Sequence, residues 1–126
     1  MKRLIAALFI TALMFCGCGG QDNSGYTQIA QSEAAELMEK QSGCIILDVR
    51  TKAEFAEGHI KNAICVPNET ITDKEPEQLP DKNQLILVYC RSGRRSKEAA
   101  QKLAAMGYTN VREFGGIIDW KGEVVK

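Results

Sequence analysis

The stretch QLILVYCRSGRRSKEAAQKLAAMG (84–107) predicts the fold of the chain. It opens with a continuous apolar run containing β-branched residues, as expected for a strand buried on both faces. Ala99, Leu103 and Met106 then recur at helical spacing, and Gly107 follows as the residue just past the helix end. A buried strand that runs into an amphipathic helix is typical of a parallel α/β sheet.

The same alternation extends over the rest of the chain. CIILDV (44–49) has the pattern of a second buried strand. Shorter strands are expected at 26–30, 63–67 and 111–114, and the charged, proline-containing segment 68–83 is expected to form a loop with a short helix. We therefore predict an α/β fold of three layers, with a mostly parallel central sheet and helices on both faces.

Two helices are predicted before the second half of the chain. The segment 32–41 begins with Ser32 as a candidate N-cap and carries an apolar stripe of Ala35, Leu37 and Met38. The segment 51–58 has Thr51 and Glu54 in capping-box spacing and ends at Gly58.

Composition limits the class of protein. The chain has 126 residues, enough for one domain, and its formal net charge is zero. A nucleic-acid-binding protein needs an excess of Lys and Arg, so that class is disfavoured. One histidine and scattered cysteines give no metal-ligand spacing, and no cofactor motif is present.

The N-terminus has a different character. MKRLIAALFITALMFCGCGG (1–20) starts with Lys2 and Arg3 and continues with an apolar run from Leu4 to Phe15. That run is shorter than the roughly 20 residues that a membrane-spanning helix needs. A charged start, a short apolar run and small residues after it are typical of a secretory signal peptide.

The motif FCGC (15–18) resembles the lipobox of bacterial lipoproteins, in which a cysteine after a small residue is acylated. Cys18 follows Gly17 and fits best; acylation of Cys16 and ordinary signal cleavage are the alternatives. We expect a lipoprotein signal peptide at 1–17, a flexible lipid-anchored tether at 18–25 and a folded domain at 26–126. The mature protein is then exported and anchored to the cell membrane.

Cys90 is the candidate reactive residue. It ends the predicted strand 84–90, and ligands of open α/β sheets bind at the carboxyl ends of the strands. Backbone N–H groups of the following loop and the positive end of the next helix both favour a sulfur anion there. Arg91, Arg94 and Arg95 add positive charge that suits an anionic reactant.

Four segments together resemble the single-domain rhodaneses, a family of thiosulfate sulfurtransferases. They are DVRTKAEFAEGHIKNAICVP (48–67), LVYCRSGRRS (87–96), AAQKLAAMGYTNV (99–111) and FGGIIDWKG (114–122), and the resemblance covers about 26–122. It implies that the Cys90 thiolate takes the outer sulfur of thiosulfate, releases sulfite, and passes the sulfur from a persulfide to cyanide or another thiophilic acceptor. It also implies an active-site loop made of Arg91, Ser92, Gly93, Arg94 and Arg95. A monomer is the default expectation.

Two other functions stay open. Cysteine-dependent phosphatases and arsenate reductases use a Cys-x5-Arg loop, whereas the loop from Cys90 to Arg95 is one residue shorter. A shorter loop should fit a single sulfur atom better than a tetrahedral phosphate. A sulfur carrier or binding module without catalysis on the same fold is the second alternative.

Asp48 and Arg50 end the strand predicted beside that of Cys90, so we expect them to support the same pocket. Bracing of the loop is favoured over contact with the substrate, and Glu54 is placed to pair with Arg50 on the short helix. Cys44 and Cys65 lie in apolar segments and are expected to be buried, unreactive thiols. His59 is expected to be a structural turn residue, and Trp120 a packing anchor.

Overall fold

A computed structural model describes residues 25–126. In chain order, its elements are β1 (Thr27–Gln28), α1 (Gln31–Lys40), β2 (Ile45–Asp48), α2 (Lys52–Glu57), β3 (His59–Ile60), β4 (Ile64–Cys65), η1 (Asn68–Thr70), β5 (Ile86–Cys90), α3 (Arg94–Ala105), β6 (Val111–Gly116), η2 (Ile117–Asp119) and β7 (Val124–Val125).

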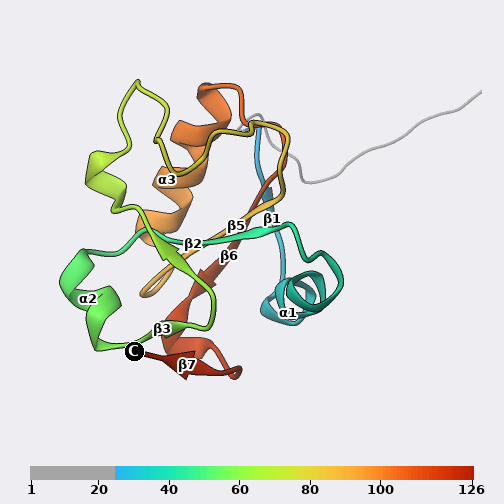
Figure 1. Ribbon diagram of the computed structural model, residues 1–126, viewed down its shortest axis with the longest axis vertical. Coiled ribbons are helices and arrows are strands. Elements are labelled where there is room, and N and C mark those ends of the chain that lie inside the picture. The colour runs from blue at the N-terminus through green and yellow to red at the C-terminus, as the bar shows by residue number, and fades with distance from the viewer. Residues whose placement is uncertain (1–24) are drawn as a thin grey trace, which may run out of the picture.

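The central sheet has the strand order β1-β6-β5-β2-β4, and every neighbouring pair in it is parallel. Helices α3 and α1 cover opposite faces of this sheet (Figure 1). The predicted α/β fold, with a mostly parallel central sheet between helices, is therefore confirmed.

Strand β5 supplies side chains to both faces of the sheet. Ile86, Val88 and Cys90 pack in the cluster that contains the α3 residues, whereas Leu87 and Tyr89 pack in the cluster that contains Ala34 of α1. This alternation follows from the two-residue period of a strand. It places the Cys90 side chain on the α3 side of the sheet.

The two predicted helix ends with clear local signals are confirmed. Thr51 accepts a hydrogen bond from the backbone N–H of Glu54, and the Glu54 carboxylate accepts one from the N–H of Thr51, which completes the capping box. At the end of α3, Gly107 has φ of 100°, and the N–H groups of Gly107 and Tyr108 donate to Ala104 and Leu103. This is the hydrogen-bond pattern of a Schellman motif.

The predicted N-cap of α1 is wrong. The helix begins at Gln31 after an extended Ala30, so Ser32 lies within its first turn and makes no cap. The start of α1 is held by tertiary contacts, because Gln31 Nε2 donates to the backbone oxygens of Phe114 and Gly116, at 3.2 and 2.9 Å. Ala34, rather than the predicted Ala35, is the fully buried residue of this helix.

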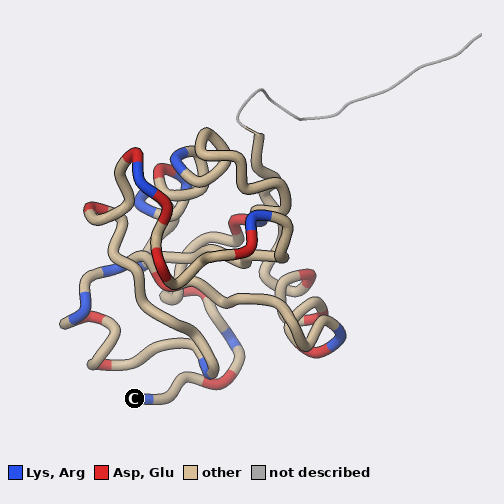
Figure 2. The backbone as a smooth tube through the Cα atoms, turned by 45° about the horizontal axis from the view of Figure 1, so that its top comes forward, with Lys and Arg blue, Asp and Glu red and all other residues tan. Residues whose placement is uncertain are grey.

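The sequence patterns did not predict the small second sheet. In it, β3 pairs antiparallel with β7 at the end of the chain. Each strand has two residues, which is too short for a periodic pattern. Figure 2 shows basic and acidic residues interspersed in several segments of the described chain, with uncharged stretches between them.

The predicted signal peptide at 1–17, the predicted acylation site Cys18 and residues 18–24 of the predicted tether fall outside the described residues. Within residues 25–126, no helix is both long enough and apolar enough to cross a membrane.

Candidate active site

Cys90 lies at the carboxyl end of β5, in the middle of the sheet, and its side chain is almost fully buried. The following loop turns at Gly93, which has φ of 115°, and α3 begins at the next residue. The backbone N–H of Gly93 donates to Cys90 Sγ at 3.0 Å. A left-handed turn that suits glycine therefore aims a hydrogen-bond donor at the sulfur.

The neighbouring strand β6 packs directly against this loop. Val88 is opposite Glu113, and Cys90 is opposite Gly116, so β6 carries one extra residue between the two pairs. This is a β-bulge, and Gly115 within it has φ of 95°. A Cβ atom on Gly116 would lie 2.0 Å from the backbone oxygen of Arg91, so a glycine is required there.

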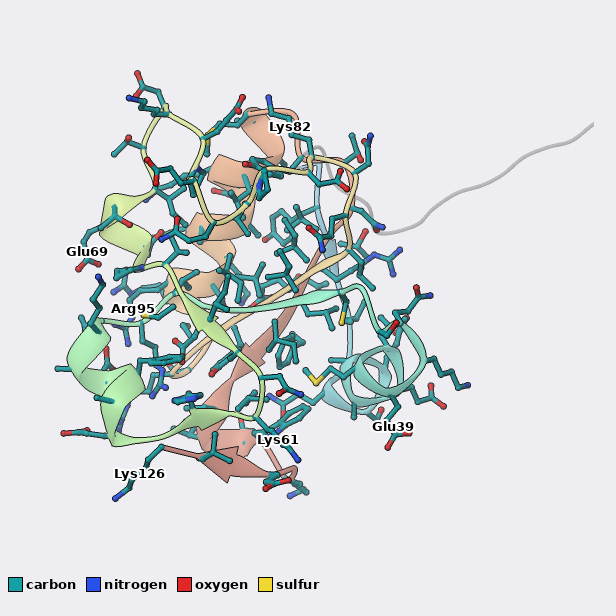
Figure 3. The ribbon with its side chains drawn as sticks, in the orientation of Figure 1. Glu39, Lys61, Glu69, Lys82, Arg95 and Lys126 are labelled. Atoms are coloured by element: carbon teal, nitrogen blue, oxygen red, sulfur yellow. The ribbon has the colours of Figure 1, made fainter. Side chains whose placement is uncertain are left out.

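The three arginines of the loop have different surroundings. Arg95 is half-buried and donates to both oxygens of Glu54, at 2.8 and 3.1 Å. In Figure 3, Arg95 lies beside α2. The Arg95 hydrogen bond, helped by those from Thr51, lowers the pKa of Glu54 to about 2. Arg95 therefore fastens the loop to α2.

Arg91 and Arg94 are exposed, as is Ser92 between Cys90 and the turn. Arg94 forms a surface pair with Glu98 one turn along α3, at 3.0 Å. A surface pair of this kind contributes little to stability. The exposed guanidinium groups can reorient toward an anion in solution.

Asp48 and Arg50 are both buried and form a bidentate pair. Arg50 also donates to the backbone oxygen of Gly58 at 2.6 Å, and the Tyr89 hydroxyl donates to Asp48 at 2.7 Å. Both side chains are thus occupied by contacts within the fold. The predicted pairing of Glu54 with Arg50 is wrong, because Asp48 occupies Arg50 while the capping box and Arg95 occupy Glu54.

Two residues behind the loop, Ser96 and Glu113, were not predicted from the sequence. Ser96 is fully buried in the first turn of α3, and its Oγ lies 3.4 Å from Cys90 Sγ. Glu113 of β6 is also buried and accepts a hydrogen bond from Ser96. The sequence did contain a signal that both residues are buried. Helical spacing puts Ser96 on the same helix face as Ala99 and Ala100, and strand alternation puts Glu113 on the same sheet face as Val111.

The other two cysteines of the domain lie at the edge of the fold. Cys44 and Cys65 are half-buried, so the expectation that both are buried is wrong, and both are free thiols, as is Cys90. Burial raises the pKa of each of these two thiols.

His59 stacks on Phe55 with the ring centroids 3.7 Å apart, and its Nδ1 lies 2.9 Å from the backbone oxygen of Phe55. Trp120 packs against Phe114 with the ring centroids 5.6 Å apart.

Comparison with known proteins agrees with this geometry. Residues 30–123 match the model of the rhodanese-like domain. Thiosulfate sulfurtransferase GlpE of Coxiella burnetii is 36% identical over 97 residues, which cover 76% of this chain and 88% of GlpE. Thiosulfate sulfurtransferase PspE of Escherichia coli is 37% identical over 73 residues, which cover 58% of this chain and 70% of PspE.

Solved structures give the same result. A rhodanese from E. coli, solved with anions, superposes with a TM-score of 0.61 at 35% identity and covers 66% of this chain and 98% of that one. A rhodanese-like domain protein of Staphylococcus aureus gives 0.66 at 32% identity, covering 77% and 93% of the two chains. The chain belongs to the rhodanese family.

Proposed function

We propose that the protein is a sulfurtransferase that takes a sulfur atom from thiosulfate and carries it on Cys90. The Cys90 thiolate attacks the outer sulfur of thiosulfate, and a new S–S bond forms. The bond between that sulfur and the sulfonate group breaks, and its electron pair leaves with sulfite. Cyanide or another thiophilic acceptor then takes the outer sulfur of the persulfide and restores the thiolate.

The main observation in support of this proposal is the hydrogen bond that the Gly93 N–H donates to Cys90 Sγ. Both the thiolate and the persulfide are anions, and a backbone donor held by a fixed turn stabilises an anion without any rearrangement. The exposed Arg91 and Arg94 supply cations for the sulfonate oxygens of the donor. The names of GlpE and PspE as thiosulfate sulfurtransferases support the same donor.

Phosphatase or arsenate reductase activity is the weaker candidate. The arginine that those enzymes direct at an oxyanion corresponds most closely to Arg95, but Arg95 is occupied by both oxygens of Glu54. A sulfur carrier without catalytic turnover would form the Cys90 persulfide from the donor but would not pass the sulfur on to cyanide.

The intact mass of the protein after incubation with thiosulfate tests the proposal. We expect a gain of one sulfur that maps to Cys90, followed by its loss and the release of thiocyanate when cyanide is added. Cys90→Ser removes both events, whereas Cys65→Ser, which changes a half-buried thiol elsewhere, retains them. A persulfide without thiocyanate release would indicate a carrier, and hydrolysis of an aryl phosphate without sulfur uptake would indicate the phosphatase.

We also propose that the protein works at a membrane surface outside the cytoplasm. The charged and apolar start of the chain and the cysteine at 18 support export and acylation. Several acyl chains on one cysteine bind a bilayer stably, because each buried methylene contributes about 0.8 kcal/mol.

A further inference from the structure

Glu113 is a buried acid with no cation among its hydrogen-bond partners in the described part of the chain. Its side chain lies behind the Cys90 loop and is 1% exposed. The donors to it are Ser96 Oγ, the Gly115 N–H at 3.0 Å and Gln28 Nε2 at 3.2 Å, all of them neutral. A buried carboxylate without a counter-charge is costly, so its position beside the reactive cysteine requires a reason.

Ser96 connects this carboxylate to the nucleophile. A serine hydroxyl has one proton to donate and two lone pairs. The nearest acceptor of the Ser96 proton is Glu113 Oε2 at 2.5 Å, and the Gly93 backbone oxygen follows at 3.0 Å. When that proton points to Glu113, a lone pair of Ser96 Oγ faces Cys90 Sγ, 3.4 Å away, and accepts the thiol proton.

We propose that Ser96 and Glu113 form a proton relay that activates Cys90. The inference rests on the proposed function, in which Cys90 is the nucleophile. The S–H bond of Cys90 breaks as its proton moves to Ser96 Oγ, and the original hydroxyl proton of Ser96 moves to Glu113 Oε2. Cys90 becomes a thiolate that accepts hydrogen bonds from Ser96 and from the Gly93 N–H, and Glu113 becomes a neutral acid. No residue is oxidised or reduced in this step.

The relay leaves the net charge of Cys90, Ser96 and Glu113 unchanged. If the thiol proton were lost to solvent while the Glu113 carboxylate kept its charge, two desolvated anions would lie only one hydroxyl apart. Internal transfer moves one negative charge from the carboxylate to the sulfur instead. Ser96 touches the reacting atom, and Glu113 acts through Ser96 as a positioning residue and proton acceptor.

A cavity of about 420 Å³ gives the relay an outlet to solvent. Glu113 lines it together with Gln28, Gln31 and Gly93, and the charged residues in its wall are Lys97 from α3 and Asp119 from η2. Arg95 of α3 is the charged residue that acts on Cys90 itself, and its pKa is raised, chiefly by its hydrogen bond to Glu54 and in part by Cys90. A proton on Glu113 can therefore exchange with water without passing the sulfur.

Alkylation of Cys90 by iodoacetamide across pH 4–10, followed by peptide mass mapping of the full-length protein, tests the relay. Two coupled acids release their protons in two steps, so the parent should show a low-pH step and a high-pH step in the Cys90 rate. Cys44 and Cys65 are internal controls, because each should show one step near the alkaline end. This readout does not require sulfur transfer, so it remains interpretable if the proposed function fails.

Glu113→Gln keeps the shape of the side chain and removes the proton acceptor. The Gln28 amide can turn to match the new amide, and a thermal melt by circular dichroism checks the fold. We expect the low-pH step to disappear and the Cys90 rate at pH 6 to fall by at least about tenfold, since a positioned proton acceptor contributes factors of this size or more. Ser96→Ala should have the same effect.

The proposal would be overturned by a single-step profile in the parent, or by a Glu113→Gln profile that superimposes on the parent profile. The parent measurement decides the question even if both variants fail to fold. Normal sulfur transfer with a single-step profile would refute the relay and leave the proposed function intact. A two-step profile in a protein that takes up no sulfur would do the reverse.

Discussion

Glu54 and Arg95 join the first turns of two helices, α2 and α3. Glu54 completes the capping box at the start of α2, and Arg95 lies in the first turn of α3, with its two nitrogens 2.8 and 3.1 Å from the carboxylate oxygens. One carboxylate thus caps one helix and anchors the other. The end of the Cys90 loop is fixed by a residue 41 positions earlier in the chain.

Removing the charge of Glu54 should lower stability in a pH-dependent manner. Glu54→Gln retains the capping geometry, since glutamine also serves at that position, and it loses the ion pair. We expect the free energy of unfolding at pH 7 to fall by about 0.5–1 kcal/mol, because the pair is partly exposed. Urea denaturation of both proteins measures the difference.

The sign of the pH dependence follows from the lowered pKa of Glu54, about 2 against an ordinary 4.5. A carboxylate of this kind stabilises the fold above its unfolded pKa and loses that contribution as the pH falls through the folded value. The difference between parent and variant should therefore be constant above pH 5 and shrink between 4.5 and 2. Glu57→Gln, an exposed change on the same helix, is the control; an equal effect there would contradict the assignment.

Neutralising Arg91 or Arg94 should weaken donor binding more than chemistry. Both side chains are exposed, so each contributes a screened contact to the dianionic donor. We expect the KM for thiosulfate to rise by about two- to fivefold with little change in kcat, since exposed ion pairs are worth up to about 1 kcal/mol. Assays with Arg91→Gln and Arg94→Gln at low salt measure this effect.

The same effect should shrink above about 0.1 M salt, where the screening length is roughly 10 Å. Lys40→Gln in the last turn of α1 is the control, and its KM should equal that of the parent. If both arginine variants also match the parent at low salt, the backbone of the loop binds the anion without them.

The cysteine at position 18 should determine where the protein is found. In a bacterial host, the mature form is expected to carry acyl groups on Cys18 and to sediment with membranes. Cys18→Ala should block processing or release the protein, and Cys16→Ala should do neither. Mass spectrometry of the mature N-terminus separates these outcomes, and an unacylated form that starts elsewhere would contradict the proposed anchor.

The elements that the sequence predicted are those with strong local signals. The runs 44–49 and 84–90 are apolar enough to indicate buried strands, and Gly93 lies where a tight turn is needed. The contacts of the site depend instead on register. Ser96 meets Glu113 because α3 packs on the face of the sheet where β6 pairs Glu113 with Val88 of β5, and no spacing in the sequence encodes that pairing. Arg95 finds Glu54 only through the packing of α2 beside the loop.

The hydroxyl of Tyr89 should stabilise the domain from the face of the sheet opposite Cys90. It donates to Asp48 and accepts from the backbone N–H of Ile60 at 3.0 Å, and burial raises its pKa. Tyr89→Phe leaves a buried N–H without its acceptor, which costs about 1–3 kcal/mol. Tyr108→Phe is the matched control, because its hydroxyl makes one bond, to the backbone oxygen of Leu79.

Chemical denaturation of these two phenylalanine variants should show the larger loss for Tyr89→Phe. Sulfur transfer by that variant at 25 °C should stay close to the parent rate, since the missing hydroxyl faces away from the sulfur. A large loss of activity in a fully folded Tyr89→Phe protein would mean that the Asp48–Arg50 pair acts on the substrate.

The conformation of Gly93 should be needed for chemistry as well as for folding. A Cβ atom there would come no closer than 3.8 Å to Gly115 Cα, so Gly93→Ala creates no clash and tests only the backbone angle of φ 115°. That angle disfavours alanine by about 1–3 kcal/mol, and relief of the strain tilts the N–H away from Cys90 Sγ. We expect lower stability and sulfur transfer reduced by about tenfold, the equivalent of roughly 1.4 kcal/mol. Gly43→Ala, where nothing lies within 4 Å and φ is not positive, should change neither. If Gly93→Ala transfers sulfur at the parent rate, the Gly93 N–H is not the donor that holds the sulfur anion, and the observation that carries the proposed function loses its force.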